Sequence, residues 1–253
     1  NAWNDYGSDL DSVVTNSYEL SYLSEKEIAF LIGLLRQHHS LGYLAELSTE
    51  EQKEALSKRA GRQLLVALHE ATLGKPFREI VKDEYDSISN AQAQSLYLTV
   101  CILHRLGTET RAGLIARIHH IPFSLFREKL FKPLESIVFV QETQYTRDFV
   151  YRSRHQHIAE IVFEAILTDQ RERYDEYVRL ISNIDIGYQA DRDALHGLIS
   201  AKQLRLLFEE DSLITSIYEL AGNRFPDEYH IHQQQAVFEM KRQNGDLVKA
   251  EAL

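Results

Sequence analysis

The sequence contains few of the residues that make tight turns and cross-links. It has 253 residues, of which 11 are glycine, 4 are proline and one is cysteine. So few glycines and prolines leave little room for the many turns of an all-β fold, and we expect a mainly α-helical protein. The single cysteine, Cys101, cannot form an internal disulfide and lies in an apolar segment. This favours a core position for its thiol and the reducing cytoplasm as the compartment.

Long apolar runs and excess positive charge are absent as well. No apolar run reaches the roughly 18 residues that a membrane-spanning helix needs, and no signal peptide is visible. The formal net charge is -10 at pH 7, which argues against general affinity for nucleic acid or anionic membranes. The 44% of apolar residues can still build cores, and the length allows one large domain or two to three small ones.

A nucleotide-binding loop is the third missing feature. The sequence has no Gly-x-x-x-x-Gly-Lys-Ser/Thr motif, whose backbone amides would bind phosphate groups. Its one Gly-Lys pair, Gly74-Lys75, precedes Pro76 and is typical of a helix end. No acidic strand end that could hold Mg²⁺ is visible either. By itself this chain is therefore expected to lack ATPase activity and to need no cofactor.

Residues 1–89 begin with a polar leader and continue as helices. Residues 1–22 hold one short strand-like stretch at 17–20. Ser24 and Glu27 then form a capping box, in which a hydroxyl and a carboxylate satisfy free amides at a helix start. The apolar stripe that follows is Ile28, Leu31, Ile32 and Leu35. Further helices are expected from Ser48, ending before Gly74, and over residues 77–88.

Residues 90–154 predict three helices followed by a β-hairpin. Asn90 caps a long apolar helix that Gly107 ends, and Thr110 caps a shorter one. The remaining elements are a helix over residues 123–134 and two strands over 136–140 and 149–152. Three helices followed by a hairpin is the winged-helix order.

From residue 155 onward the sequence predicts only helices. Their expected ranges are 155–168, 171–183, 190–208, 211–223, 227–243 and one that begins near 246. Paired helices of similar length with short polar links favour a helical solenoid. Residues 234–239 followed by 244–250 resemble a tetratricopeptide unit, in which small side chains permit close helix contact.

The junction between these two parts carries residues that could bind a phosphate group. The strand pattern of residues 149–152 gives way to a helical stripe of Ile158, Ile161, Val162 and Ala165, and His155 and His157 lie at the change. Free amides and the helix dipole favour anions at such a place, and Arg154 adds a positive charge. The alternative is that these are ordinary polar residues at the surface start of a helix.

The order of these segments resembles the rear half of a STAND-type signalling NTPase. In that family a P-loop core precedes a helical lid, a winged helix and an array of repeats that senses a ligand. The resemblance assigns residues 1–22 to the tail end of the NTPase core, 23–89 to the lid, 90–154 to the winged helix and 155–253 to TPR-like repeats. Asn1-Ala2-Trp3-Asn4 resembles the residues that follow the sensor arginine of the core.

The resemblance also implies nucleotide-binding residues. Residues 62–68 with Gly74 and Pro76 look like the lid helix and its Gly-x-Pro turn, which contacts the adenine. A helix stop explains the same glycine and proline without a ligand. Arg154-His155-Gln156 occupies the place of the Met-His-Asp motif, whose histidine contacts the β-phosphate of ADP. Methionine and aspartate are absent here, and His157 offers an alternative register.

If the resemblance holds, the chain is part of a longer protein. It begins without methionine and stops within a helical pattern, as expected for such a piece. The whole protein would carry an upstream P-loop core with ATP or ADP and Mg²⁺, and an N-terminal effector domain. A protein ligand on the repeats would release the ADP-bound form and allow a homo-oligomer to assemble. Similar proteins act in prokaryotic antiviral defence.

Two other classes of function remain open. A winged helix can bind DNA, and residues 123–134 carry Arg127, Lys129 and Lys132. The same segment presents Phe123, Leu125, Phe126 and Phe131, which favours packing on protein over reading a DNA groove. The second alternative is a helical-repeat scaffold that binds no nucleotide.

Histidine pairs suggest a zinc site but do not form one by spacing. The pairs are His119-His120, His155-x-His157 and His230-x-His232. They lie far apart in the sequence and have no cysteine partner at the spacing of a metal finger. We therefore expect no metal site.

Overall fold

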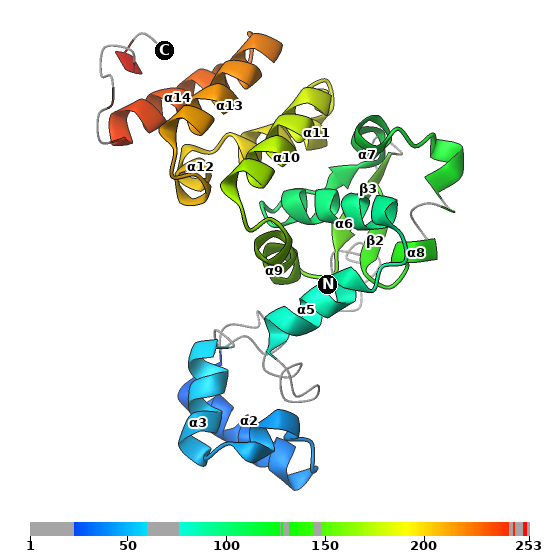
Figure 1. Cartoon of the computed structure of the whole chain (residues 1–253), viewed down its shortest axis with the longest axis vertical. Helices are drawn as coiled ribbons and strands as arrows, with labels where there is room; N and C mark the ends of the chain where they lie inside the picture. The colour runs from blue at the N-terminus through cyan, green and yellow to red at the C-terminus, as the bar shows by residue number, and fades with distance from the viewer. Residues whose placement is uncertain are drawn as a thin grey trace, which may run out of the picture. The chain divides into compact units, whose positions relative to one another are not determined.

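The computed structural model describes residues 23–59, 76–126, 128, 132–143, 148–242, 245 and 250–251 (Figure 1). The chain is mainly helical with a small antiparallel sheet, which confirms the coarse fold class predicted from composition. Its contacts divide it into two compact units, Asn1–Asp83 and Glu84–Leu253. No helix in the described ranges is both long enough and apolar enough to cross a membrane. The expected strand at 17–20, the expected lid helix at 62–68 and Gly74 lie outside the described residues.

The first unit begins with helices whose starts are set by local sequence. Its described elements are α2 (Glu25–Gln37), the 3-10 helix η1 (Gly42–Glu46), α3 (Thr49–Glu54) and the π-helical turn η2 (Ala55–Arg59). The predicted capping box is present: the Ser24 hydroxyl accepts from the Glu27 amide at 3.3 Å, and the Glu27 carboxylate accepts from the Ser24 amide at 2.7 Å. Ser48 and Glu51 repeat this arrangement at α3. The buried face of α2 is Ile28, Ile32 and Leu35.

The second unit contains a sheet covered by helices. After α5 (Phe77–Asp86), which crosses the boundary between the units, come α6 (Ala91–His104), β1 (Thr110–Arg111), α7 (Ala112–His119), the 3-10 turn η3 (Phe123–Leu125), α8 (Lys132–Leu134), β2 (Val138–Glu142) and β3 (Phe149–Ser153). Among the described residues the three strands form one antiparallel sheet in the order β1-β3-β2. α6 packs against both β3 and the later helix α9 (Gln156–Ile166), so it is buried on nearly all sides (Figure 1).

Three details of residues 110–153 differ from the predictions. Thr110 does not cap a helix; it pairs with Tyr151 in β1, and α7 begins at Ala112. The alternation of buried and exposed residues that is typical of a strand is absent from β3, because α6, α7 and α9 pack against it and Val150, Tyr151, Arg152 and Ser153 are all buried. Phe126 is buried beside the Tyr151 ring rather than exposed.

The helices that follow α9 in the second unit pack on one another. Its elements after α9 are α10 (Gln170–Asn183), α11 (Gln189–Leu198), α12 (Ala201–Leu207), α13 (Asp211–Arg224) and α14 (Tyr229–Lys241). α10 packs on α13, α12 on α14, and α13 on α14 (Figure 1). The single helix expected over 190–208 is wrong, since it divides into α11 and α12 at Ile199 and Ser200. The Tyr218 hydroxyl donates to the carbonyl oxygen of Ile199 at 3.0 Å, which satisfies the backbone at the break.

Candidate functional site

His155 caps helix α9 with its own side chain. The residue is extended, follows β3 after Arg154, and its Nδ1 accepts a hydrogen bond from the His157 amide at 3.1 Å. The predicted change from strand to helix at this point is therefore confirmed. Because Nδ1 accepts, the neutral ring carries its proton on Nε2. No partner for this Nε2–H lies among the described residues, and the side chain is exposed.

Two residues that the sequence did not nominate hold the backbone of His155. The Ser153 hydroxyl is fully buried and donates to the His155 carbonyl oxygen at 3.0 Å. The Ser153 oxygen accepts in turn from Nδ1 of His104, on α6, at 2.8 Å. Because these residues lie far apart in the sequence, no local pattern could have predicted that they meet. Together they connect the end of β3, the start of α9 and the last turn of α6.

The first turn of α9 offers further donors. The amides of Gln156 and Ile158 have no hydrogen-bond acceptor among the described residues. Such free amides carry the positive end of the helix dipole. The His155 Nε2–H and these two amides are therefore the groups of this site that can donate to an anion.

The formal charge of the site is lower than the sequence suggests. Arg154 forms an ion pair with Glu84 of α5, so its charge is largely compensated. Partial burial and the neighbouring His157 lower the pKa of His155, and burial lowers the pKa of His157 as well. Both rings are thus neutral at pH 7. The site would bind an anion through N–H donors rather than through cationic side chains.

The two other nominated residues, Gly74 and Pro76, belong to the first unit, whereas His155 and His157 belong to the second. Pro76 is exposed in the first unit and directly precedes α5, where its carbonyl oxygen accepts from the amides of Glu79 at 2.9 Å and Ile80 at 3.2 Å. It thus occupies a helix start in the structure. Gly74 lies outside the described residues. Of the four nominated residues, His155 and His157 lie together.

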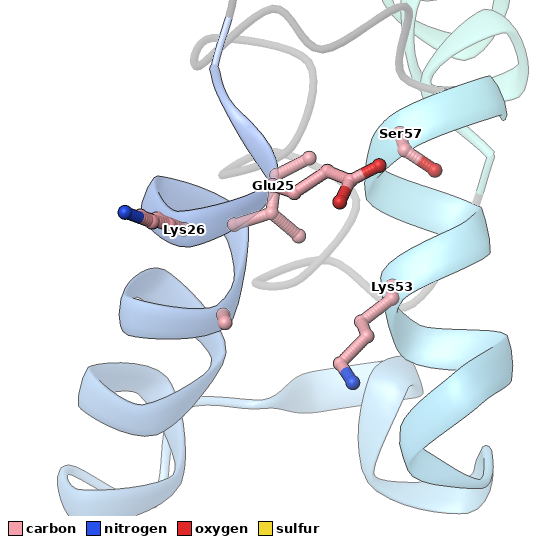
Figure 2. A pocket seen from close by; sticks show the side chains of 6 residues that line it. Glu25, Lys26, Lys53 and Ser57 are labelled. Atoms are coloured by element: carbon pink, nitrogen blue, oxygen red, sulfur yellow. The ribbon is translucent and has the colours of Figure 1, made fainter.

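A separate hollow of about 400 Å³ lies in the first unit. Its lining consists of Glu25, Lys26, Ile28, Ala29, Lys53 and Ser57. Figure 2 shows Glu25 extending from α2 toward Ser57, while Lys26 points away from the gap. Lys53 lies 3.6 Å from the carboxylate of Glu50, and this pair is largely exposed to water. The polar groups of the hollow do not converge on one point, so we assign it no ligand.

Similarity to known proteins does not identify the site. Comparisons with protein-family models, with curated proteins and with solved structures each gave no match. Within the described part of the chain, no cluster of three or more histidine, cysteine or acidic side chains is placed to hold a metal ion. The function must therefore be inferred from the sequence pattern and the geometry of the α9 start.

Proposed function

We propose that the chain is the regulatory and sensor region of a STAND-type signalling ATPase. Residues 1–22 would end the P-loop core, 23–89 form the lid, 90–154 the winged helix and 155–253 TPR-like repeats. The ATPase activity itself would reside in an upstream core with ATP or ADP and Mg²⁺. Antiviral defence is the biological role that the resemblance implies.

The observation that carries this proposal is the geometry of His155. The ring of this exposed residue caps α9 through Nδ1, which fixes its orientation and leaves Nε2–H free at the helix start that also holds the two free amides. A histidine held in this way can donate to a phosphate oxygen without being charged. The Met-His-Asp motif of the resembled family places its histidine at the same junction between winged helix and repeats.

The order of the elements supports the same assignment. Residues 91–153 run α6, β1, α7, α8, β2, β3 with strand order β1-β3-β2, which is compatible with a winged helix. From α10 to α14, each of the contacts α10–α13, α12–α14 and α13–α14 joins helices near one another in the chain, which is compatible with a solenoid of helix pairs. Both features support the proposal and leave the nature of the sensed ligand open.

The proposed mechanism is a shift between two populations. ADP bound to the core would accept the His155 hydrogen bond only in the closed form, so this contact stabilises that form. A ligand on the repeats opens the protein when its preference for the open form outweighs such contacts. Nucleotide exchange and assembly of a homo-oligomer would follow.

The test uses the longer protein that contains the P-loop core. A hydrogen bond to a charged acceptor contributes about 1.5 to 3 kcal/mol. Since about 1.4 kcal/mol is a factor of ten, His155→Ala should shift the closed-to-open ratio roughly ten- to a hundredfold. The variant is expected to assemble partly without its trigger, as measured by light scattering, while His157→Ala should have a smaller effect.

A second variant separates phosphate binding from helix capping. Asparagine is a good N-cap residue but places no donor where Nε2 lies. His155→Asn should therefore assemble without its trigger, as His155→Ala does. If His155→Asn behaves like the unmodified protein, the histidine is only a cap and the proposal fails.

A further inference from the structure

Asp191 is a fully buried carboxylate in the first turn of α11. Both of its oxygens are occupied by hydrogen-bond donors. Oδ1 accepts from Arg111 Nε at 3.0 Å, and Oδ2 accepts from Arg111 Nη2 at 3.4 Å, Arg117 Nη2 at 2.6 Å and the Asp185 amide at 3.1 Å. Four donors match the acceptor capacity of one carboxylate, so its buried charge is well compensated.

The donors come from the sheet and from the helix that follows it. Arg111 belongs to β1, and Arg117 lies on α7. Arg111 also pairs with Asp148, just before β3, at 3.0 Å. Its guanidinium lies 3.6 Å from the centre of the Tyr188 ring. Together these contacts hold the start of α11 against two strands and a helix of the sheet region.

The surrounding backbone provides an acceptor for Arg117 and space for the guanidinium of Arg111. Arg117 Nε donates to the Asn183 carbonyl at the end of α10, at 2.7 Å. A Cβ atom on Gly113 would lie 2.4 Å from Arg111 Nη1, so a larger residue there would displace the guanidinium. The arginines thus bind both the end of α10 and the start of α11.

Directed hydrogen bonds can fix one relative orientation of the packed elements more strictly than apolar contacts do. Apolar surfaces can slide or rotate over one another at little cost, whereas a carboxylate with four donors has one good geometry. Buried ion pairs often add little to stability relative to apolar residues of the same size, and their best-attested role is to fix register. The position of this cluster, between two groups of elements, suits that role.

We propose that Asp191, Arg111 and Arg117 form an ionic lock that sets the orientation of helices α10–α14 on the β1-β3-β2 sheet. While the lock is formed, a displacement of these helices is passed to β1 and α7. When it opens, the helices can turn relative to the sheet about the contacts that α10 keeps with α6, which include Arg105–Tyr177 and Arg179–Thr99. This proposal goes beyond the function proposed above and does not depend on nucleotide or on the identity of a ligand.

The test measures orientation rather than stability. Spin labels are attached to Val140→Cys on β2 and Glu219→Cys on α13, while Cys101 is fully buried and stays unlabelled. The complete 253-residue chain should give a single narrow distance peak by double electron–electron resonance. Asp191→Asn, which has nearly the same shape but puts a donor against the arginines, should lose that peak and give a broad distribution. Asp193→Asn, an exposed site on the same helix, should leave it unchanged.

A merely structural role for Asp191 predicts a different result. The variant would then melt at a lower temperature but keep the narrow peak in the cold, and this outcome would overturn the proposal. If Asp191→Asn does not fold, Arg117→Met is the variant to measure, because Arg117 is partly exposed and its loss removes the 2.6 Å contact with the Asp191 carboxylate. Broadening in Arg117→Met supports the lock, and an unchanged peak rejects it.

Discussion

At the scale of single residues, the hydroxyl of Tyr218 connects α13 to two neighbouring parts of the helical region. The side chain is buried on α13, and its hydroxyl lies 3.0 Å from the Ile199 carbonyl and 3.2 Å from that of Gln234. Ile199 marks the break between α11 and α12, and Gln234 lies within α14. One hydroxyl thus serves three neighbouring elements, while its ring packs beside Phe238.

Removing this hydroxyl should destabilise the second unit. Tyr218→Phe keeps the ring but leaves the two carbonyl groups without this donor, which should cost about 1 to 3 kcal/mol of unfolding free energy. Urea unfolding followed by circular dichroism gives the value. Tyr229→Phe is the matched control because Tyr229 is 83% exposed, and its effect should stay within about 0.5 kcal/mol. Equal stabilities of the two variants would contradict the assignment.

Two partly buried histidines, His104 and His119, should make the protein sensitive to acid. Burial, with Arg152 and His155 nearby, lowers the pKa of His104 to about 4, and burial with Arg179 and His120 lowers that of His119 to about 4. In the unfolded chain these histidines bind protons near pH 6.5, whereas in the folded chain they stay neutral down to about pH 4. The folded state therefore keeps its full stability above pH 6.5 and loses stability as the pH falls toward 4. Each histidine should therefore lower the free energy of unfolding by about 2 kcal/mol when the pH falls from 7 to 5.

A variant isolates the contribution of His104. His104→Asn retains an N–H donor for Ser153 but does not titrate, so its loss of stability between pH 7 and pH 5 should be smaller by about 2 kcal/mol. Urea unfolding at both pH values measures this difference. His38→Gln, at an exposed position, should keep the full loss. An identical pH dependence in His104→Asn and the unmodified chain would show that folding does not lower the pKa of His104.

At the scale of elements, α6 shows how both ends of a helix are set by local sequence. The Asn90 side chain accepts from the Ala93 amide at 2.7 Å at its start. At its end Gly107 takes a left-handed conformation with φ of 80°. This lets the Gly107 amide donate to His104 at 2.9 Å and the Thr108 amide to Leu103 at 3.2 Å. These are the two bonds of a Schellman motif.

Two glycine substitutions should act in opposite directions. Gly107→Ala forces a side chain into the left-handed region and should destabilise by about 1 to 2 kcal/mol. Gly222, within α13, has open space around the position of a Cβ atom. Gly222→Ala should therefore stabilise by about 0.4 to 1 kcal/mol, because alanine restricts the unfolded chain. Thermal unfolding of both variants tests the pair, and a stabilising Gly107→Ala would contradict the turn geometry.

At the scale of the whole molecule, charge bears on the DNA-binding alternative. The formal net charge of -10 opposes a polyanionic partner. Within the described part of residues 123–134, Lys132 is exposed, Leu125 is 38% exposed and Phe126 is buried. Arg127 and Lys129 lie outside the described residues. The alternative therefore depends on a direct binding measurement.

We expect no salt-sensitive affinity for duplex DNA. Non-specific DNA-binding proteins reach dissociation constants of about 10⁻⁴ to 10⁻⁶ M at physiological salt. Fluorescence anisotropy with a labelled duplex should show binding weaker than this range, with no change on Lys132→Glu. Micromolar binding that disappears at higher salt and in Lys132→Glu would instead favour a winged-helix DNA-binding regulator.

Features with local causes could be predicted from the order of the residues. Capping residues and apolar spacing act within about four residues, so the starts of α2, α3 and α6, the end of α6 and the change from strand to helix at His155 could be predicted. The mainly helical class followed from composition. His155 and His157 were nominated from their place at this change together with the family resemblance, and their role in a site stays a prediction.

Contacts between residues far apart in the sequence follow from the packing of the folded chain. β1 has two residues and too little pattern to be recognised, and it exists because Thr110 and Arg111 pair with the central strand β3. The Tyr218 hydroxyl reaches the Ile199 carbonyl at the break between α11 and α12, and partial burial lowers the pKa of His104. Arg111 and Asp191 lie 80 residues apart, yet they share a buried ion pair. Spacing along one sequence records periodicity within an element, whereas pairing between elements depends on packing that brings their surfaces together.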